Sequence, residues 1–303
     1  MASLKEVKTR IASVNSTRKI TSAMKMVASS KLHKAQQSIE SMRPYERLLN
    51  KIMGTFVQSM EGELPSPYAA VRPVQRVALV VYTSNSSLCG GFNANIIKAF
   101  NKKVEAYRKE GVEVSQVVAF GKKALEAVRK AGWTDAQDCG ALLDHPAYAP
   151  AAKVAAELMQ KFVDGEVDRV ELIYHHFRSS ASQVITQETL LPISIDATAT
   201  GEAAEEKHGG KKLDFIVEPS KEQIVLQLIP KALYLKLYTA LLDSLASEHA
   251  ARVIAMQIAT DNADELLREL TLTYNKTRQQ AITTELLDIV GGSMQLDLKN
   301  HLI

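Results

Sequence analysis

The sequence predicts an α/β domain combined with two long terminal helices that pair antiparallel as a coiled coil. Both ends of the chain carry a helix-capping pattern followed by a 3,4-spaced row of apolar and small residues. The middle alternates short apolar runs with amphipathic segments, which is typical of a three-layer, Rossmann-like α/β domain. With 303 residues, 46% of them hydrophobic, and a formal net charge of +3, the chain has enough apolar material for one or two folded domains.

The C-terminal segment, residues 218–303, is predicted to form one helix of roughly 80 residues, or about 120 Å, starting at Ser220. Ser220 and Gln223 have the spacing of a capping box. Apolar and small residues dominate its seam, which favours a close-packed coiled coil. The seam runs through Val225, Leu228, Ala232, Leu235, Thr239, Leu242, Ala246, His249, Val253, Met256, Thr260, Ala263, Leu267, Leu270, Tyr274, Thr277, Ala281 and Thr284. From Ile282 the apolar stripe changes register, so we expect the last turns to contact a different partner.

The N-terminal segment, residues 1–60, predicts a second long helix, opened by a capping box of Ser3 and Glu6. We expect Pro44 to kink this helix without ending it. Its seam is Leu4, Val7, Ile11, Val14, Arg18, Thr21, Lys25, Ala28, Leu32, Ala35, Ile39 and Met42. The many basic residues of this helix suit either a solvated surface or an acidic partner. Because aromatic residues are not interleaved with them, nucleic acid is not an expected partner.

A linker at residues 61–75 leads into the central α/β domain, which we place at residues 76–217. Residues 76–83 form a continuous apolar run and predict a buried strand. Further strands are predicted at residues 112–120, 169–177, 183–190 and 213–217, helices at 93–109, 122–131 and 151–163, and a surface loop at 197–212.

The two terminal helices define a testable geometry. If they pair antiparallel from the same end of the central domain, the positions of paired residues add to roughly 280. Met24 then lies near Met256, and residues beyond about Arg278 have no partner in the first helix. The sequence therefore predicts a single projecting helix of roughly 30 Å, whose apolar side chains need a cover.

The candidate chemistry of the chain is sparse. The loop at residues 84–92 follows a strand and precedes a helix, but it lacks both the G-x-G-x-x-G pattern and a Lys after the glycines. His175 and His176 fall in one strand and therefore point to opposite faces. Cys89 and Cys139 have no metal-ligand spacing, and we expect both to be reduced and structural. No catalytic residues, metal ligands or cofactor are predicted. We also expect no membrane span and no signal peptide, which favours the cytoplasm.

Four segments resemble one known family. They are SVNSTRKITSAMKMVASSK at residues 13–31, LCGG at 88–91, SEHAARVIAMQIATDN at 247–262 and LTLTYNKTRQQAITTELLDIVGG at 270–292. In order and spacing they are similar to the gamma subunits of F-type ATP synthases. The chain departs from the usual family pattern at Asn85-Ser86-Ser87, where Asp-Arg-Gly is common, and at Gly292-Ser293, where Gly-Ala is common.

The resemblance implies a non-catalytic rotor. Its partners would be the alpha and beta subunits, the epsilon subunit and the c-ring, at the cytoplasmic face of a bacterial inner membrane, to which it would attach peripherally through the c-ring. It further implies contact residues in three groups. Arg278, Gln279, Thr283, Glu285 and Asp288 match the contacts with the beta catch loop; Met24, Lys25 and Arg252 match the lever region; and Glu218 matches the foot that faces the c-ring. A non-catalytic coiled-coil adaptor and a nucleotide-using α/β enzyme are the alternatives.

Overall fold

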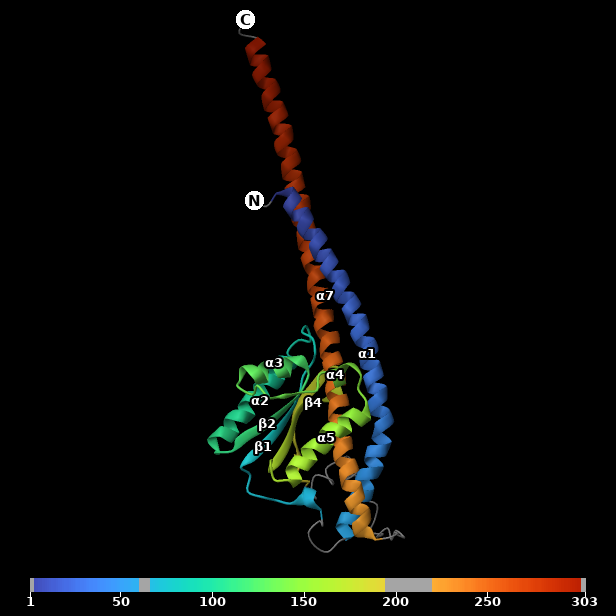
Figure 1. The fold of residues 1–303 in the computed structure, drawn as a ribbon. Helices are drawn as coiled ribbons and strands as arrows, with labels where there is room; N and C mark the ends of the chain where they lie inside the picture. Colours follow the sequence, from blue (N-terminus) through green and yellow to red (C-terminus); the bar gives the residue numbers. More distant parts are fainter. Residues whose placement is uncertain (1–2, 60–65, 194–219, 301–303) are drawn as a thin grey trace. The chain divides into compact units, whose positions relative to one another are not determined.

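The computed structural model describes residues 3–59, 66–193 and 220–300 (Figure 1). The chain divides into two compact units, residues 28–253 and residues 1–27 with 254–303. The predicted loop at 197–212, the predicted strand at 213–217 and the candidate residue Glu218 lie outside the described residues. The proposed domain boundaries stay a prediction.

Both long helices are present and start at their predicted caps. α1 spans Leu4–Ser59 and α7 spans Lys221–Asn300. At each start a serine hydroxyl accepts a hydrogen bond from the backbone N–H three residues on, from Glu6 to Ser3 at 3.3 Å and from Gln223 to Ser220 at 3.2 Å. These bonds satisfy donors that the first helical turn leaves unpaired. As predicted, α1 continues through Pro44, and α7 likewise continues through Pro230.

The larger unit contains a five-stranded sheet in the order β3-β2-β1-β4-β5. Its strands are β1 (Arg76–Tyr82), β2 (Glu113–Phe120), β3 (Gln137–Asp138), β4 (Arg169–Ser179) and β5 (Ser182–Leu191). β1 to β4 run parallel, and β5 pairs antiparallel with β4. The strands predicted at residues 76–83, 112–120, 169–177 and 183–190 are confirmed. The two-residue strand β3 was not predicted, because two residues show no periodicity.

Helices cover both faces of this sheet, as the three-layer prediction requires (Figure 1). α2 (Phe92–Lys109) and α3 (Lys122–Lys130) pack on the face that carries Val77, Leu79 and Val81. α5 (Tyr148–Val163) and α7 pack on the face of Ala78, Val80 and Tyr82. β1 is buried on both faces because its alternate side chains enter two separate cores.

Short elements fill the connections. A 3-10 helix, η1 (Pro67–Ala69), lies in the predicted linker, and α4 (Ala141–Asp144) lies in a stretch predicted to be irregular. α5 starts three residues earlier than predicted, at Tyr148. Both cysteines are free and buried, in agreement with their predicted structural role, and burial raises the pKa of Cys139 to about 12.

The expectation that no segment could span a membrane is corrected in part. By length and composition alone, a window within residues 223–290 of α7 is apolar enough to cross one. Of that window, 44% is buried inside the protein.

Candidate functional site

In the smaller unit α1 and α7 lie side by side and antiparallel (Figure 1). Among the described residues of this unit, three side-chain contacts join them across the pair. They are Arg18 Nη1 to Asp264 Oδ1 at 2.9 Å, the hydroxyls of Thr21 and Thr260 at 2.9 Å, and Lys25 Nζ to Gln257 Oε1 at 2.8 Å. The paired positions add to 281 or 282 in every case. The predicted value of roughly 280 is therefore confirmed.

The seam of this pair owes its stability to apolar packing rather than to charge. Val7 on α1 and Met256, Ala263 and Leu270 on α7 are all at least nine-tenths buried. The Arg18–Asp264 ion pair is about two-fifths exposed on both sides, so solvent screens it and it contributes at most about 1 kcal/mol. Its larger effect is to fix the register, because a shifted pairing would place a charge against an apolar neighbour.

The pairing ends where the sequence predicted. With position sums of 281 or 282, Leu4 at the start of α1 lies opposite residue 277 or 278 of α7. Leu270 is the last buried residue in the described part of α7, and every residue from Arg278 to Val290 is exposed. Five large apolar side chains in this free end are 49–66% exposed, namely Ile282, Leu286, Leu287, Ile289 and Val290.

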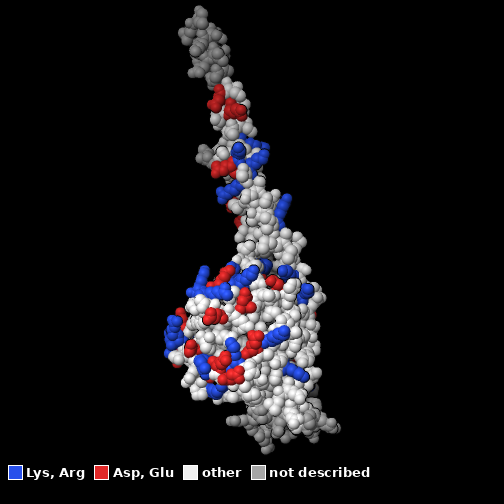
Figure 2. Space-filling model, in the orientation of Figure 1, with Lys and Arg blue, Asp and Glu red and all other residues white. Residues whose placement is uncertain are grey.

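The five predicted catch-loop residues all lie on this free end. Arg278, Gln279, Thr283, Glu285 and Asp288 are exposed, and the Thr283 hydroxyl donates to the Gln279 carbonyl at 2.9 Å. Helical spacing places Ile282, Leu286 and Ile289 within about 60° of one another, and Arg278 and Gln279 border that stripe on its two sides. In Figure 2 acidic side chains lie along the rod just below the grey tip. The end therefore offers an apolar stripe edged by polar groups.

Met24 and Lys25 lie within the paired region. Met24 is half-buried in the seam, and Lys25 donates to Gln257 across the pair. Met26 and Val27, beside them, are 63% and 58% exposed. Neither was singled out from the sequence, because they fall off the seam, where a side chain is ordinarily solvated.

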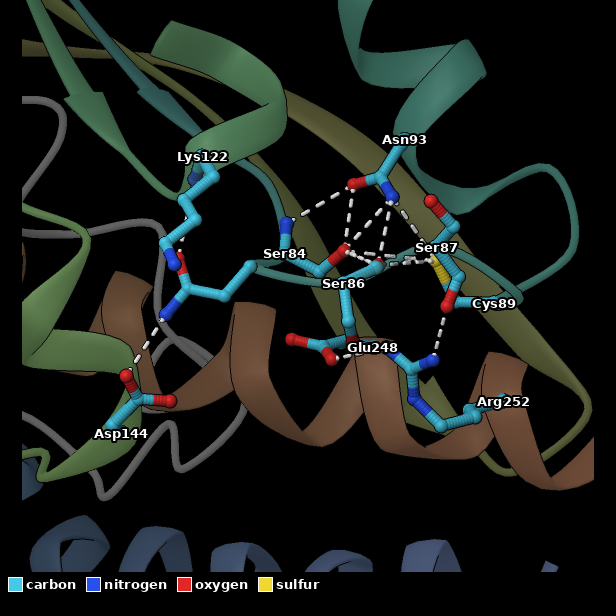
Figure 3. Close-up of polar contacts among 10 residues, drawn as sticks. Ser84, Ser86, Ser87, Cys89, Asn93, Lys122, Asp144, Glu248 and Arg252 are labelled. Carbon is cyan, nitrogen blue, oxygen red and sulfur yellow. Dashed lines mark hydrogen bonds and ion pairs between the residues drawn. The ribbon is translucent and has the colours of Figure 1, made fainter. Parts of the chain in front are cut away.

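Arg252 lies among contacts within the chain itself. Its side chain belongs to the larger unit and is nine-tenths buried (Figure 3). It donates to the Ser87 carbonyl, to the Ser86 hydroxyl at 2.9 Å and to Glu248 Oε1 at 2.6 Å. Both terminal nitrogens thus donate within the chain, and the assignment of Arg252 to the lever region stays a prediction.

The loop held by Arg252 belongs to residues 84–92, the strand-to-helix connection whose sequence lacks the G-x-G-x-x-G pattern. Its polar groups bond to one another, since Asn93 Oδ1 accepts from the backbone N–H and the hydroxyl of Ser84, both at 3.0 Å (Figure 3). Leu88 at its tip adopts a φ of 66° and is 62% exposed. A non-glycine residue in this left-handed region carries backbone strain and stays there only where its surroundings hold it. The loop is thus a fixed structural turn.

The two adjacent histidines diverge, as predicted. His175 is 3% exposed and stacks on Phe92 with ring centroids 4.4 Å apart. Burial lowers the pKa of His175 to about 4. His176 is half-exposed and contacts Asp243 of α7 at 2.6 Å, and this hydrogen bond raises the pKa of His176.

Comparison with known proteins agrees with these features. The family model described as ATP synthase matches residues 3–296. An ATP synthase gamma chain of Phocaeicola vulgatus is 56% identical over 294 residues, covering 97% of this chain and 100% of the relative. The gamma chain of Flavobacterium johnsoniae is 44% identical over 297 residues, covering 98% of this chain and 100% of the relative.

Solved structures share the fold at lower identity. The central stalk and c-ring structure of the Tetrahymena thermophila mitochondrial ATP synthase contains a chain that matches with a TM-score of 0.56 and 24% identity, covering 79% of this chain and 99% of that one. A chain of the Euglena gracilis mitochondrial ATP synthase, in a structure of OSCP, F1 and c-ring, matches with a TM-score of 0.60 and 19% identity. The match covers 97% of this chain and 94% of that one. On the strength of the family match and the full-length relatives, this chain belongs to the ATP synthase gamma chain family.

Proposed function

We propose that this chain is the central rotor of an F-type ATP synthase, coupling proton-driven rotation of a c-ring to ATP synthesis and hydrolysis in a head of alpha and beta subunits. It is a non-catalytic subunit of that membrane-associated complex. The observation that carries the proposal is the end of α7. There a helix leaves its partner near Arg278 and exposes an apolar stripe edged by polar side chains.

The physical argument starts from solvent exposure. Five large apolar side chains on a single helix are costly to leave in water, so a surrounding protein sleeve is expected. A ring of alternating alpha and beta subunits supplies such a sleeve and can turn around a smooth apolar stripe. Directional contacts at its border then distinguish one rotor angle from another.

We place the catch-loop contacts at Arg278 and Gln279, with Thr283, Glu285 and Asp288 beside them. The Arg278 guanidinium is a planar fork suited to a carboxylate, and the Gln279 amide can both donate and accept. Met24 and Lys25 are proposed for the lever region of the beta subunit, on a helix pair whose basic residues suit an acidic segment. Glu218 is proposed to face the c-ring, and the epsilon subunit is proposed as a further rotor partner.

We further propose that the complex lies at the cytoplasmic face of the bacterial inner membrane, with this chain attached peripherally through the c-ring. The gamma chains of Phocaeicola vulgatus and Flavobacterium johnsoniae, to which the chain is similar, are bacterial, which supports that location.

The test is assembly and rotation. The tagged chain, expressed in its own cells, should co-purify with alpha, beta, epsilon and c subunits in membranes. In a complex whose head is fixed to a surface, a bead on this chain should rotate when ATP is added. Purification of the chain without other subunits, or a bead that stays still in an ATP-hydrolysing complex, would contradict the proposal.

A further inference from the structure

Polar contacts join α7 to the sheet along one side of the helix. Lys236 Nζ lies 2.9 Å from Glu188 Oε1 and donates to the Thr189 carbonyl of β5 at 3.1 Å. Further along, Asp243 Oδ2 lies 2.6 Å from His176 Nδ1 of β4. The fully buried Ser247 hydroxyl donates to the His175 carbonyl of the same strand at 3.1 Å. At about 100° per residue Lys236, Asp243 and Ser247 lie within about 40° of one another.

A second group of contacts approaches α7 from another direction. Glu248 and Arg252 bond to each other, and Arg252 reaches Ser86 and the Ser87 carbonyl in the loop after β1 (Figure 3). On the helix these two residues lie roughly 100–180° around from the first stripe. Between the two, the buried Tyr82 hydroxyl of β1 donates to the Leu237 carbonyl of α7 at 3.2 Å.

The rest of this interface is apolar. Leu233, Leu237, Leu241 and Leu245 of α7 are buried in the core that also holds Val80 of β1. Apolar packing holds the helix against the sheet but has no preferred direction. It therefore resists a small rotation of the helix about its axis only through the shape of the packed side chains. Hydrogen bonds lose strength steeply when their angle changes. Contacts on two separate stripes therefore resist rotation of α7 in both senses.

We propose that these two stripes form a torque clamp that fixes the rotational angle of α7 in the sheet unit, and that Arg252 is a positioning residue of this clamp. The inference rests on the proposed rotor function, because only a subunit that transmits torque needs such a clamp. Arg252 acts through its own chain here, by holding the loop of Ser86 and Ser87 against α7. The clamp spans Lys236 to Arg252, about 24 Å of helix.

The experiment measures the torsional stiffness of the rotor in the assembled complex. The head is fixed to a surface, and a bead is attached through Lys109→Cys, an exposed position at the end of α2. Without ATP, the angular variance of the bead reports stiffness. Arg252→Met with Glu248→Gln removes the side-chain contacts of the second stripe without leaving a lone buried charge. Lys236→Met with Asp243→Asn weakens the contacts of the first stripe.

Each pair of substitutions should widen the angular distribution, roughly doubling the variance if the two stripes share the load equally, and the four together should widen it further. Arg252→Lys should give an intermediate value, because an ammonium keeps the charge beside Glu248 but not the planar fork that reaches two loop oxygens. The same variants should lower ATP-driven proton pumping per ATP hydrolysed.

Two control variants separate the clamp from general stability. Val128→Ala shortens a fully buried side chain of α3 in the core on the other sheet face, which holds no described residue of α7, so it should lower the melting temperature without changing the variance. Arg129→Met, on an exposed position of α3, should change neither. Unchanged variance in both clamp variants, or an equal increase in Val128→Ala, would overturn the clamp. A parent complex whose bead does not rotate with ATP would instead contradict the rotor function itself.

Discussion

Arg18 and Asp264 lie 246 positions apart in the chain, yet their side chains meet at 2.9 Å. Thr21 and Thr260 meet one helical turn further along, with their hydroxyl oxygens 2.9 Å apart. The two contacts therefore define a single antiparallel register between α1 and α7.

This register predicts an intramolecular disulfide. Thr21→Cys with Thr260→Cys should oxidise to a crosslink within one chain, because the replaced oxygens are already in contact. The measurement is migration on a non-reducing gel after mild oxidation. Thr17→Cys with Thr260→Cys is the matched control, since Thr17 is exposed off the seam, and it should stay uncrosslinked. Equal crosslinking of both pairs would mean that the helices slide or that the register is wrong.

Arg278 and Gln279 are predicted to affect turnover of the assembled complex. In Arg278→Ala with Gln279→Ala, the loss of a charge-assisted contact of about 2 kcal/mol that forms at only some rotor angles should slow ATP hydrolysis roughly 30-fold. Subunit content checks that the complex is intact. Arg129→Ala should leave turnover unchanged. Normal turnover of the double variant in a complete complex would assign both residues to ordinary solvated surface.

The apolar stripe of the free end should favour assembly into the complex but lower the solubility of the isolated chain. Leu286→Ser with Ile289→Ser removes two exposed apolar side chains, so the isolated chain should aggregate less in size-exclusion chromatography. The same change should reduce incorporation into the complex, because the sleeve loses its apolar contact. Leu226→Ser, at another exposed position of α7, is the control for exposed leucines in general. Increased aggregation of the double variant would contradict the prediction.

Two buried histidines predict acid sensitivity. Desolvation lowers the pKa of His175 to about 4 and, together with Lys31 and Arg252, lowers that of His249 to about 4, from an ordinary value of 6.5. Between pH 6.5 and pH 4 these two histidines are protonated in the unfolded chain but stay neutral in the folded chain. The free energy of unfolding therefore falls as pH drops from 6.5 to 4. For His175 the loss is about 3 kcal/mol over that window.

The measurement is urea unfolding at a series of pH values. His175→Phe should flatten the acid slope, because a phenyl ring can keep the stack on Phe92, and the buried Nδ1 of His175 has no hydrogen-bond partner to lose. The exposed His33→Gln serves as the control. An acid slope that is identical in His175→Phe and in the parent would show that His175 is not its source.

His176 predicts a slope of the opposite sign. Its hydrogen bond to Asp243 raises the pKa of His176, so the stabilisation is complete below the ordinary value of 6.5 and is lost as pH rises through the higher folded value. Burial, with Asp243 and Glu188 next, raises the pKa of Glu46 on α1, so this carboxyl also lowers stability as pH rises, but starting from its ordinary value of 4.5. Because His176 is half-exposed, the effect should stay below about 1 kcal/mol. Melting temperatures of His176→Asn and the parent, compared from mildly acidic to mildly alkaline pH, should converge as pH rises.

The sequence predicted those parts of the fold that depend on local patterns. Capping pairs such as Ser3 and Glu6, the two seams and the alternating core strands each follow from residues close together in the chain. The pairing geometry followed from these elements and chain order alone, and so did the free end at Arg278. The contact between Arg252 and Ser86 could not be predicted in this way, because 166 positions separate the two residues, Arg252 lies off the helix seam and Ser86 lies in a loop. The contact between His176 and Asp243 could not be predicted for a similar reason, since the strand and the helix come together only in the folded sheet unit.

The free end of α7 also has a thermodynamic consequence for the helix itself. A short isolated helix is marginal in water because its first turn is costly to form, but this one continues from a turn that tertiary packing already holds. It can therefore melt residue by residue from its C-terminus instead of all at once. Gly291 and Gly292 lie within α7 and each weakens a helix by about 1 kcal/mol relative to alanine. The two glycines thus make α7 locally less stable just before its last turns, and the helical content of those turns depends on what surrounds them.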